Sequence, residues 1–478
     1  MMKKIIVLTL VLSLISGIGV MGQKSIANPL KLNNGPHLFI DDYLIAEQSF
    51  LNRVVNNPEK LEKPVLAGGE KPVQVFLPYL SVLHDPQAGK YRLWTGALKE
   101  SKEKKNYCHI VYTESLDGIH WGRPEILKEP QKVQLNCKVI DRGIDFSDKQ
   151  KRYVMGVYLF KGLRIFTSPD GFAWSPLSDE TVILHSLDIN SLHWDPIRNQ
   201  YIAIVSRWKK GFGDPAYPLV DDTRRIPYES VSNDLVNWEP MWQIFSPNMT
   251  PIEKGETQFY GMSGIIARGD LLIGLVKVLR DDLNATYGKD AKGMGELERK
   301  AGGIGYTVLA WSHDGRTWER DYEPFIPRNY MPGTFDHAMA WGDEQIIVGD
   351  ETFIYYGGYE RGHKVNRFEE RHIGLARMPI DRYVSRDADL INMGTLITKP
   401  LIINAESLTV NANVKEMARV RVLDSKHKPL HDYGWINFSG DSIAHKIAWI
   451  KSLKNISGKP VCLEFQLKEA QLFGFNLY

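Results

Sequence analysis

A seven-residue pattern recurs four times along this chain, and it constrains the fold more than any other feature of the sequence. The four copies are SLDGIHW (115–121), SPDGFAW (168–174), SNDLVNW (232–238) and SHDGRTW (312–318). The aspartate can accept backbone N–H bonds within a tight turn, and glycine supplies the positive φ that such a turn requires. The closing tryptophan is expected to pack between neighbouring sheets. One turn repeated along the chain therefore predicts one repeated structural unit.

The segments between these turns have the composition of β-strands. Short runs rich in Val, Ile, Tyr, Phe and Trp are bounded by Asp, Asn, Gly and Pro. Two of the runs are near-copies, SVLHDPQAGKYRLW (81–94) and SLHWDPIRNQYIAIV (191–205). In each, a strand ends in Asp-Pro, turns and returns as a second strand. A hairpin, a third strand, the aspartate turn and a short outer strand make the four-stranded unit of a β-propeller blade.

A fifth unit begins at Phe335 and ends in IGLARMPIDRYVS (373–385); it keeps the strands but lacks the turn motif. We therefore predict an all-β fold, a five-bladed β-propeller followed by a small C-terminal β-sandwich. The propeller is expected to span 23–388 and the sandwich 389–478, where apolar and polar residues alternate at period two. A β-sandwich throughout, with chance repeats of the turn, is the alternative. The C-terminal sandwich is expected to cover apolar propeller surface, and sugar binding at its tryptophans is the second interpretation.

The first 22 residues (1–22) have the layout of a secretory signal peptide. Two lysines precede an apolar run from Ile5 to about Val20, and small residues follow. A buried helix or a membrane anchor is the alternative, but the run is slightly short for a span and no second apolar stretch follows it. We therefore expect a periplasmic or secreted protein with no stable membrane insertion once the signal is removed.

Composition narrows the partners and the cofactors. The chain has 59 Lys and Arg against 57 Asp and Glu, so we expect neither nucleic acid nor an anionic membrane surface as a partner. Its 3 cysteines are too few and too scattered for a disulfide framework or a zinc site. No clear metal-ligand spacing appears in the sequence, so no cofactor is expected. An axial calcium ion held by water and backbone is left open.

The candidate site follows from propeller geometry, because residues at one end of all inner strands converge on the axis. The inner strands are expected to begin near Tyr79, Val139, Ser191, Phe259 and Ala338. Cleavage of a glycosidic bond needs two carboxyl groups, one protonated and one ionised, so acids just before these strands are the candidates. Three acids on successive blades fit this position: Asp188, Glu256 and Asp336. The alternative for each is a turn cap or a solvated loop residue.

Further polar residues are expected near the same pocket. Asp141 and Arg142 are placed just before the second inner strand. Other side chains that stand where contacts to sugar hydroxyls would be useful are Arg207, Arg225, His337 and Glu351. A structural role is the alternative for each of them.

With these residues the chain resembles a known group of proteins. The segments that carry the resemblance, beside the aspartate turns, are HLFIDDYLI (37–45), WDPIRNQYIAIVSR (194–207), FYGM (259–262), GDETFIYYGG (349–358) and IGLARMPIDRYVS. They resemble bacterial proteins similar to glycoside hydrolase family 32, within the five-bladed propeller glycosidases of families 32, 43, 68, 117 and 130. The resemblance covers most of the mature chain and implies a glycosidase that acts on an oligosaccharide or polysaccharide.

The resemblance also implies roles for single residues. Such families usually place a glutamate at the position of Glu256 as general acid, which leaves Asp188 or Asp336 as base or nucleophile; the reverse order stays open. The Asp-Asp pair of HLFIDDYLI recurs in the resembling proteins. Because adjacent strand residues face opposite sides, only one of the two can face the pocket, and we take it to be Asp42.

We therefore predict an exported glycoside hydrolase, with two alternatives on the same scaffold. A glycoside phosphorylase would need a cationic pocket for phosphate. A non-catalytic carbohydrate-binding propeller would lose the acid pair. A sialidase repeats a similar aspartate turn, but with one more residue between Ser and Trp. The Arg225-Ile226-Pro227 segment of this chain also lies mid-chain rather than ahead of the first repeat.

Overall fold

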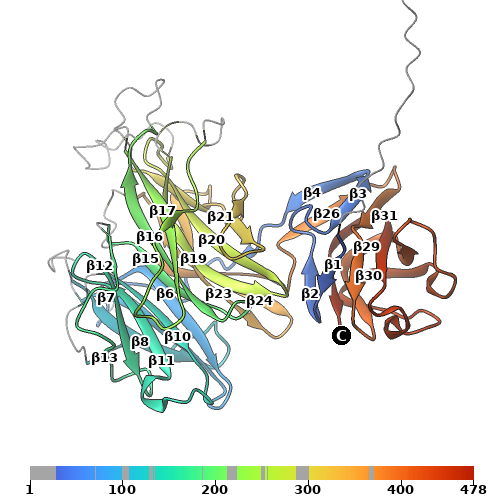
Figure 1. Ribbon diagram of the computed structural model, residues 1–478. Coiled ribbons are helices and arrows are strands. Elements are labelled where there is room, and N and C mark those ends of the chain that lie inside the picture. The colour runs from blue at the N-terminus through green and yellow to red at the C-terminus, as the bar shows by residue number, and fades with distance from the viewer. Residues whose placement is uncertain are drawn as a thin grey trace, which may run out of the picture.

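The computed structural model has two β lobes that lie side by side (Figure 1). It describes residues 28–69, 72–99, 107–128, 133, 135–185, 187–212, 223–248, 253, 255, 257–286, 301–363, 365 and 371–478. The predicted signal peptide, 1–22, lies outside the described residues. Helical structure in the described ranges consists of short 3-10 turns, and none of it is long and apolar enough to cross a membrane.

The larger lobe is a five-bladed propeller, as predicted. The first blade comprises β6 (Val75–Asp85), β7 (Lys90–Leu98), β8 (His109–Ser115) and β9 (Glu125–Ile126). The second comprises β10 (Leu135–Asp141), β11 (Tyr153–Tyr158), β12 (Gly162–Ser168), β13 (Ser175–Pro176) and a short β14 (Ile183–Leu184). The third comprises β15 (Asn190–Asp195), β16 (Gln200–Lys209), β17 (Arg224–Ser232) and β18 (Trp242–Gln243).

The fourth blade comprises β19 (Thr257–Arg268), β20 (Leu271–Arg280), β21 (Ile304–Ser312) and β22 (Glu319–Arg320). The fifth comprises β23 (Met339–Val348), β24 (Glu351–Tyr359), β25 (His372–Pro379) and β5 (Glu59–Lys60). Because β5 comes from the N-terminal part of the chain and pairs with β25, the fifth blade joins distant segments and closes the ring of blades.

Side-chain hydrogen bonds tie neighbouring inner strands together. The bonds run from Val139 N to Ser81 Oγ (2.7 Å), from Ser191 Oγ to Met262 O (2.6 Å), from Ser263 Oγ to Gly342 O (3.1 Å) and from Tyr79 N to Asp343 Oδ1 (3.2 Å). Every donor and acceptor in this set is buried, so each bond is formed away from water, where an unmade bond would be costly. The inner strands are thus held to one another and not merely packed.

The four repeated turns have the same geometry, which confirms the repeat. In each, the serine hydroxyl oxygen accepts the N–H of the residue three positions on, at 2.9 Å. That residue has a positive φ in all four, including Leu235 at +70° where the others have glycine. Donors from other blades bind the turn carbonyls: Tyr355 Oη reaches Gly118 O, Trp94 Nε1 reaches Gly171 O and Arg198 reaches His313 O. The turns therefore join blades as well as reversing the chain.

The tryptophans that close the turns are not equally buried. Trp174 and Trp318 are buried, as expected, whereas Trp121 and Trp238 are only half-buried. Trp318 donates from Nε1 to Glu229 Oε2 at 2.6 Å. Within the described residues the other carboxyl oxygen of Glu229 has no hydrogen-bond partner. Burial raises the pKa of Glu229 to about 8, so this carboxyl stays protonated in the folded protein at neutral pH.

The Glu229→Gln variant is expected to remove a pH dependence of stability. The folded pKa of Glu229 lies above its ordinary value of 4.5. Its contribution to the free energy of unfolding is therefore fully present below pH 4.5 and is lost as the pH rises to about 8. The slope is at most about 1.4 kcal/mol per pH unit. Urea unfolding of both proteins at several pH values measures it. Equal slopes in variant and wild type would contradict the assignment.

The smaller lobe is a β-sandwich formed by one ten-stranded sheet around an apolar core. Its strands are β1 (Leu30–Leu32), β2 (Gly35–Leu38), β3 (Ile45–Ser49), β4 (Leu51–Val55), β26 (Val384–Ala388), β27 (Gly394–Thr398), β28 (Leu401–Ile403), β29 (Leu408–Asp424), β30 (Ile436–Ile447) and β31 (Pro460–Leu477). The boundaries differ from the predicted 23–388 and 389–478. Four strands before residue 56 belong to the sandwich, because β1, β2 and β3 pair with C-terminal strands and β4 pairs with β26.

Candidate active site at the axial face

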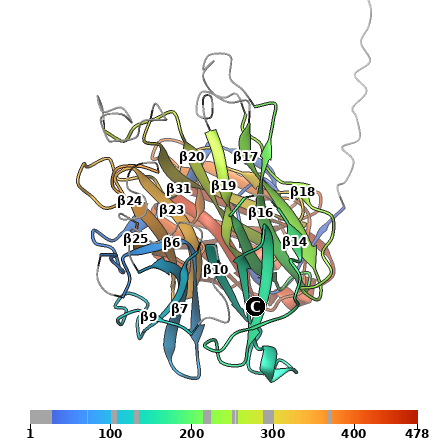
Figure 2. The same cartoon turned by 90° about the vertical axis from the view of Figure 1, so that its left-hand side faces the viewer.

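The axial face is the end of the propeller where the inner strands begin, the second strands end and the third strands begin. Figure 2 shows the blades around the inner strands β6, β10, β19 and β23, with the sandwich behind them. Antiparallel pairing within each blade brings these three strand ends together; in the third blade, Asn190 pairs with Val205, and Arg207 pairs with Ile226. Within a blade, side chains near these three strand ends are therefore neighbours at the axial face.

Asp188 and Arg225 form an ion pair at this face. Asp188 lies two residues before β15, its side chain is 51% exposed, and it accepts a hydrogen bond from Arg225 Nη1 at 3.2 Å. Arg225 comes from β17 and is only 14% exposed. Burial disfavours its charge, but nearby Tyr260 and Asp188 outweigh that effect and raise the pKa of Arg225. The guanidinium therefore remains a fixed positive charge beside the Asp188 carboxylate.

Two aromatic rings lie against the guanidinium of Arg225. Its guanidinium carbon lies 4.4 Å from the ring centroid of Tyr260 and 5.1 Å from that of Trp208. Trp208 is 47% exposed, whereas Tyr260 is buried. Tyr260 stacks on Trp341 at 4.9 Å, and the His363 ring meets it edge-on at 4.8 Å. Trp208 thus presents an indole to solvent, and the buried rings support the arginine from beneath.

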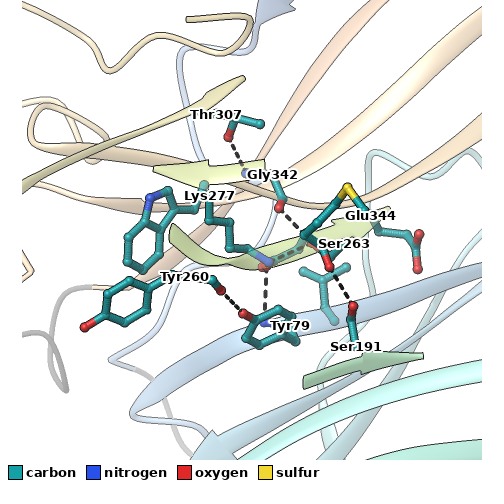
Figure 3. Close-up of polar contacts among 12 residues, drawn as sticks. Tyr79, Ser191, Tyr260, Ser263, Lys277, Thr307, Gly342 and Glu344 are labelled. Atoms are coloured by element: carbon teal, nitrogen blue, oxygen red, sulfur yellow. Dashed lines mark hydrogen bonds and ion pairs between the residues drawn. The ribbon is translucent and has the colours of Figure 1, made fainter. Parts of the chain in front are cut away.

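A buried charge network fills the propeller axis below this site. Asp343 accepts from Lys277 at 2.8 Å and from Arg371, and all three side chains are at most 1% exposed. Burial alone would raise the pKa of Asp343, but Lys277 and Arg371 hold it below its usual range. Burial lowers the pKa of Lys277 to about 8 against the pull of Asp343. Figure 3 shows Lys277 pointing toward Tyr79 and Ser263.

A second ion pair extends the axial network, since Lys138 contacts Glu344 at 2.6 Å. Three cationic groups, those of Lys138, Lys277 and Arg371, therefore occupy the axis with two acids. A calcium ion prefers a shell of oxygen ligands, so these residues do not fit the axial calcium left open by the sequence. Among the described residues no three His, Cys, Asp or Glu side chains come together as a metal site.

The structure brings two of the predicted site residues into contact, Asp188 and Arg225 of the third blade. Arg207 belongs to the same blade but pairs with Ile226 and not with Arg225. Arg207 is exposed, lies near the end of β16 and has its guanidinium 5.5 Å from the Tyr228 ring centroid. Its charge and that of Asp188 both act on His185. Glu256, predicted as general acid, lies outside the described residues.

Asp336 lies near the start of β23 as predicted, but its carboxylate is already engaged. It is 2% exposed and accepts from Lys60 Nζ at 2.6 Å and from the Tyr356 hydroxyl at 3.1 Å. Lys60 belongs to β5, the outermost strand of the fifth blade. His337 is also buried, with Nδ1 2.8 Å from Asn329 O.

Two of the predicted binding residues lie at the opposite end of the second blade. The inner strand begins at Leu135, not near Val139, so Asp141 is its last residue and cannot precede it. Its carboxylate accepts from Arg152 Nε at 2.9 Å and Nη2 at 2.7 Å. Arg142 follows it and lies over the ring of Phe146 at 4.4 Å. The prediction for both was wrong because the start of the strand was placed too late in the sequence.

The predictions for Asp42 and Glu351 are also corrected. Asp42 lies in the sandwich, between β2 and β3, and forms an ion pair with Arg386 at 2.8 Å. The strand argument failed there because the Asp-Asp pair lies in a bend and not in a strand. Glu351 is the first residue of β24, at the end of the fifth blade opposite to the axial face, with Arg377 at 4.0 Å.

Several residues at the site were missed by sequence reasoning. They are Tyr79, Trp208, Tyr260, Trp341 and the buried pair in which Gln258 donates to Asp281 at 2.8 Å. The FYGM segment was a usable signal, since it contains Tyr260 near the start of the fourth inner strand. Trp208 directly follows the predicted Arg207 in β16. Because successive side chains of a strand face opposite sides, the sequence could have predicted that one of the two shares a face with Arg225.

No protein-family model matches this chain, and no curated protein matches it. Solved structures do match: one described as a glycoside hydrolase is 13% identical, covering 68% of this chain and 93% of its own, with a TM-score of 0.44. A glycosyl hydrolase from Bacteroides ovatus is 14% identical over 74% and 95%, with a TM-score of 0.42. A β-1,2-mannobiose phosphorylase from Listeria innocua is 13% identical over 70% and 97%, with a TM-score of 0.42. At these identities and TM-scores the likeness assigns no activity to this chain.

Proposed function

We propose that this chain is an exported glycoside hydrolase that cleaves an oligosaccharide or polysaccharide at the axial face. One observation carries the proposal: the carboxylate of Asp188 and the indole of Trp208, each about half exposed, both lie beside the buried Arg225. An exposed indole offers a flat apolar surface to the C–H face of a sugar ring. A carboxylate next to it can act on the bound glycosidic bond.

The roles follow from the environments of the acids. Asp188 is 51% exposed and lies beside the exposed indole of Trp208 and the guanidinium of Arg225, so we assign it as base or nucleophile. Glu256 keeps the part of general acid as a proposal. Asp336 is assigned a structural part, because its carboxylate is only 2% exposed and pairs with Lys60, whereas that of Asp188 is 51% exposed. Residues 1–22 are proposed to direct export, with the mature protein periplasmic or secreted.

A glycoside phosphorylase is the second candidate function, and one observation favours it. Arg225 lies beside Asp188 at the axial face, Arg207 lies near the end of the neighbouring strand β16, and arginine binds phosphate through paired N–H donors. In that reaction phosphate would replace water as the attacking group. Of the two reactions, hydrolysis is preferred, because the guanidinium of Arg225 already pairs with an anion, the carboxylate of Asp188.

The test is turnover on a panel of glycosides with and without inorganic phosphate. Hydrolysis predicts release of free sugar without phosphate, and no sugar phosphate with it. Sugar phosphate formed only when phosphate is added would support the second candidate. Binding of oligosaccharide with no turnover in either condition would overturn both and leave a carbohydrate-binding propeller.

The Glu256→Gln variant tests the general acid. On substrates with poor leaving groups, kcat is expected to fall by about 100- to 10,000-fold, because the leaving oxygen is no longer protonated. Substrates with activated aryl leaving groups need little protonation and are expected to lose less than about tenfold. Steady-state kinetics on matched alkyl and aryl glycosides measures both. An equal loss on both substrate types would refute the acid assignment.

A further inference from the structure

Two inner strands are interrupted by bulges that meet at the propeller axis. The pairing of β6 with β7 shifts between Phe76 and Leu80, and that of β19 with β20 shifts between Phe259 and Met262. Tyr79 lies in the first bulge, whereas Tyr260 and Gly261 lie in the second. Bulges change the direction of side chains and are frequent beside active sites. The second bulge lies next to the Asp188–Arg225 pair, because the Arg225 guanidinium is 4.4 Å from the ring centroid of Tyr260. The charges of both partners also act on Tyr79 in the first bulge.

Tyr79 has a backbone conformation that a bulky residue rarely adopts. Its φ is +71°, within the region that favours glycine, and its side chain is fully buried. A strained conformation persists only where its surroundings impose it, and such residues cluster at functional sites. The cost of this conformation must therefore be offset by contacts that tyrosine makes and glycine would not.

Contacts from three strands impose this conformation. The backbone N–H of Tyr79 donates to Asp343 at 3.2 Å, and the Lys277 amine lies 3.7 Å from the centroid of its ring. Its hydroxyl donates to the carbonyl oxygen of Tyr260. Figure 3 shows this last bond between the two tyrosines. The hydroxyl thus joins the two bulges directly.

The second bulge leaves room for this hydroxyl and for little else. Gly261 has a φ of +96°, and a Cβ built on it would lie 3.0 Å from Tyr79 Oη and 3.1 Å from a methyl carbon of Ile189. The hydrogen bond from the Tyr79 hydroxyl to the Tyr260 carbonyl therefore restrains the backbone of β19 at both Tyr260 and Gly261. The Tyr260 ring in turn stacks on Trp341 and lies under Arg225, which donates to Asp188.

We propose that Tyr79 is a positioning residue, whose hydroxyl fixes the β19 bulge so that Tyr260 supports Arg225 and Arg225 orients the Asp188 carboxylate. This inference rests on the proposed function for its effect on turnover. The bond between the bulges itself is independent of what the site does. Catalysis is sensitive to small displacements, because misplacement of about 1 Å can lower a rate by about 100-fold.

The experiment compares Tyr79→Phe with Tyr355→Phe. Tyr355 is a matched control: it is also fully buried, and its hydroxyl also donates to a backbone carbonyl of another blade, that of Gly118 at 2.7 Å. Gly118 follows the end of β8, so this bond lies at the end of the propeller opposite to the axial face. Each variant loses one buried hydrogen bond and keeps its ring. Hydrogen–deuterium exchange of the β19 segment 257–263 and steady-state kinetics on a cleaved glycoside are measured for both.

Tyr79→Phe is expected to speed exchange in 257–263 by about tenfold, because a buried bond that closes the bulge is lost. It is also expected to lower kcat by about 100-fold with a smaller change in KM. Tyr355→Phe is expected to leave both readings at wild-type values. If Tyr79→Phe does not fold, Gly261→Ala, which presses on the same hydroxyl, is expected to give the same exchange result.

Unchanged exchange in 257–263, or equal effects in the two phenylalanine variants, would overturn the positioning role. Faster exchange with unchanged kcat would also overturn it, because the bulge would then be fixed without consequence for the site. If the wild type cleaves no glycoside, the proposed function fails, and the exchange result alone still decides whether the hydroxyl fixes the bulge.

Discussion

The Asp188→Asn variant is expected to lower kcat/KM by about 1,000-fold on any glycoside that the wild type cleaves. The amide has the shape of the carboxylate but can neither accept a proton nor attack the anomeric carbon. It also leaves the buried Arg225 without its anionic partner. Steady-state kinetics of the purified proteins measures the loss, with circular dichroism to show that both are folded.

Glu351→Gln is the matched control for this result. Sequence reasoning placed Glu351 in the pocket, whereas the structure places its 41% exposed side chain on the opposite end of the fifth blade. Its replacement is therefore expected to leave kcat/KM unchanged. A comparable loss in both variants, or full activity in Asp188→Asn, would contradict the site described here.

The Asp343→Asn variant is expected to lower the free energy of unfolding by about 3–5 kcal/mol. Asparagine keeps the shape of the side chain but removes the one carboxylate that Lys277 and Arg371 share. Two fully buried cations would then lack compensation, and burial has already lowered the pKa of Lys277 to about 8. Chemical denaturation monitored by tryptophan fluorescence measures the change.

Glu239→Gln provides the comparison for the axial network. Glu239 also forms an ion pair, with Arg316 at 2.8 Å, but both side chains are about half exposed. Its loss is expected to cost about 0–1 kcal/mol, since water solvates the remaining arginine. Equal costs for the two variants would mean that the axial charges are not isolated from water and that the network does not stabilise the ring.

The blades were predictable because their signal is local. Each aspartate turn needs only seven consecutive residues, and the same hydrogen bonds form in all four copies. The origin of the sandwich strands was not predictable in this way. Leu30 pairs with Leu401 and Gly35 with Leu477. No local sequence pattern shows which distant strand such an N-terminal strand will pair with.

The site was predictable only in part for the same reason. Asp188 and Asp336 both stand just before an inner strand, and nothing in their neighbourhoods distinguishes them. They differ in exposure: Asp336 is 2% exposed and pairs with Lys60, 276 positions away in the chain, whereas Asp188 is 51% exposed. Tyr79 was used only to mark a strand start, because its positive φ and its contact with Tyr260 arise from bulges that alternation does not reveal.

The most direct test of the axial site is a crystal structure of Asp188→Asn with a bound oligosaccharide. The account predicts a sugar ring against the indole of Trp208, with an anomeric carbon about 3–3.5 Å from the side chain at position 188 or separated from it by one water molecule. An oligosaccharide bound only elsewhere, such as on the sandwich beside Trp435 or Trp449, would contradict it.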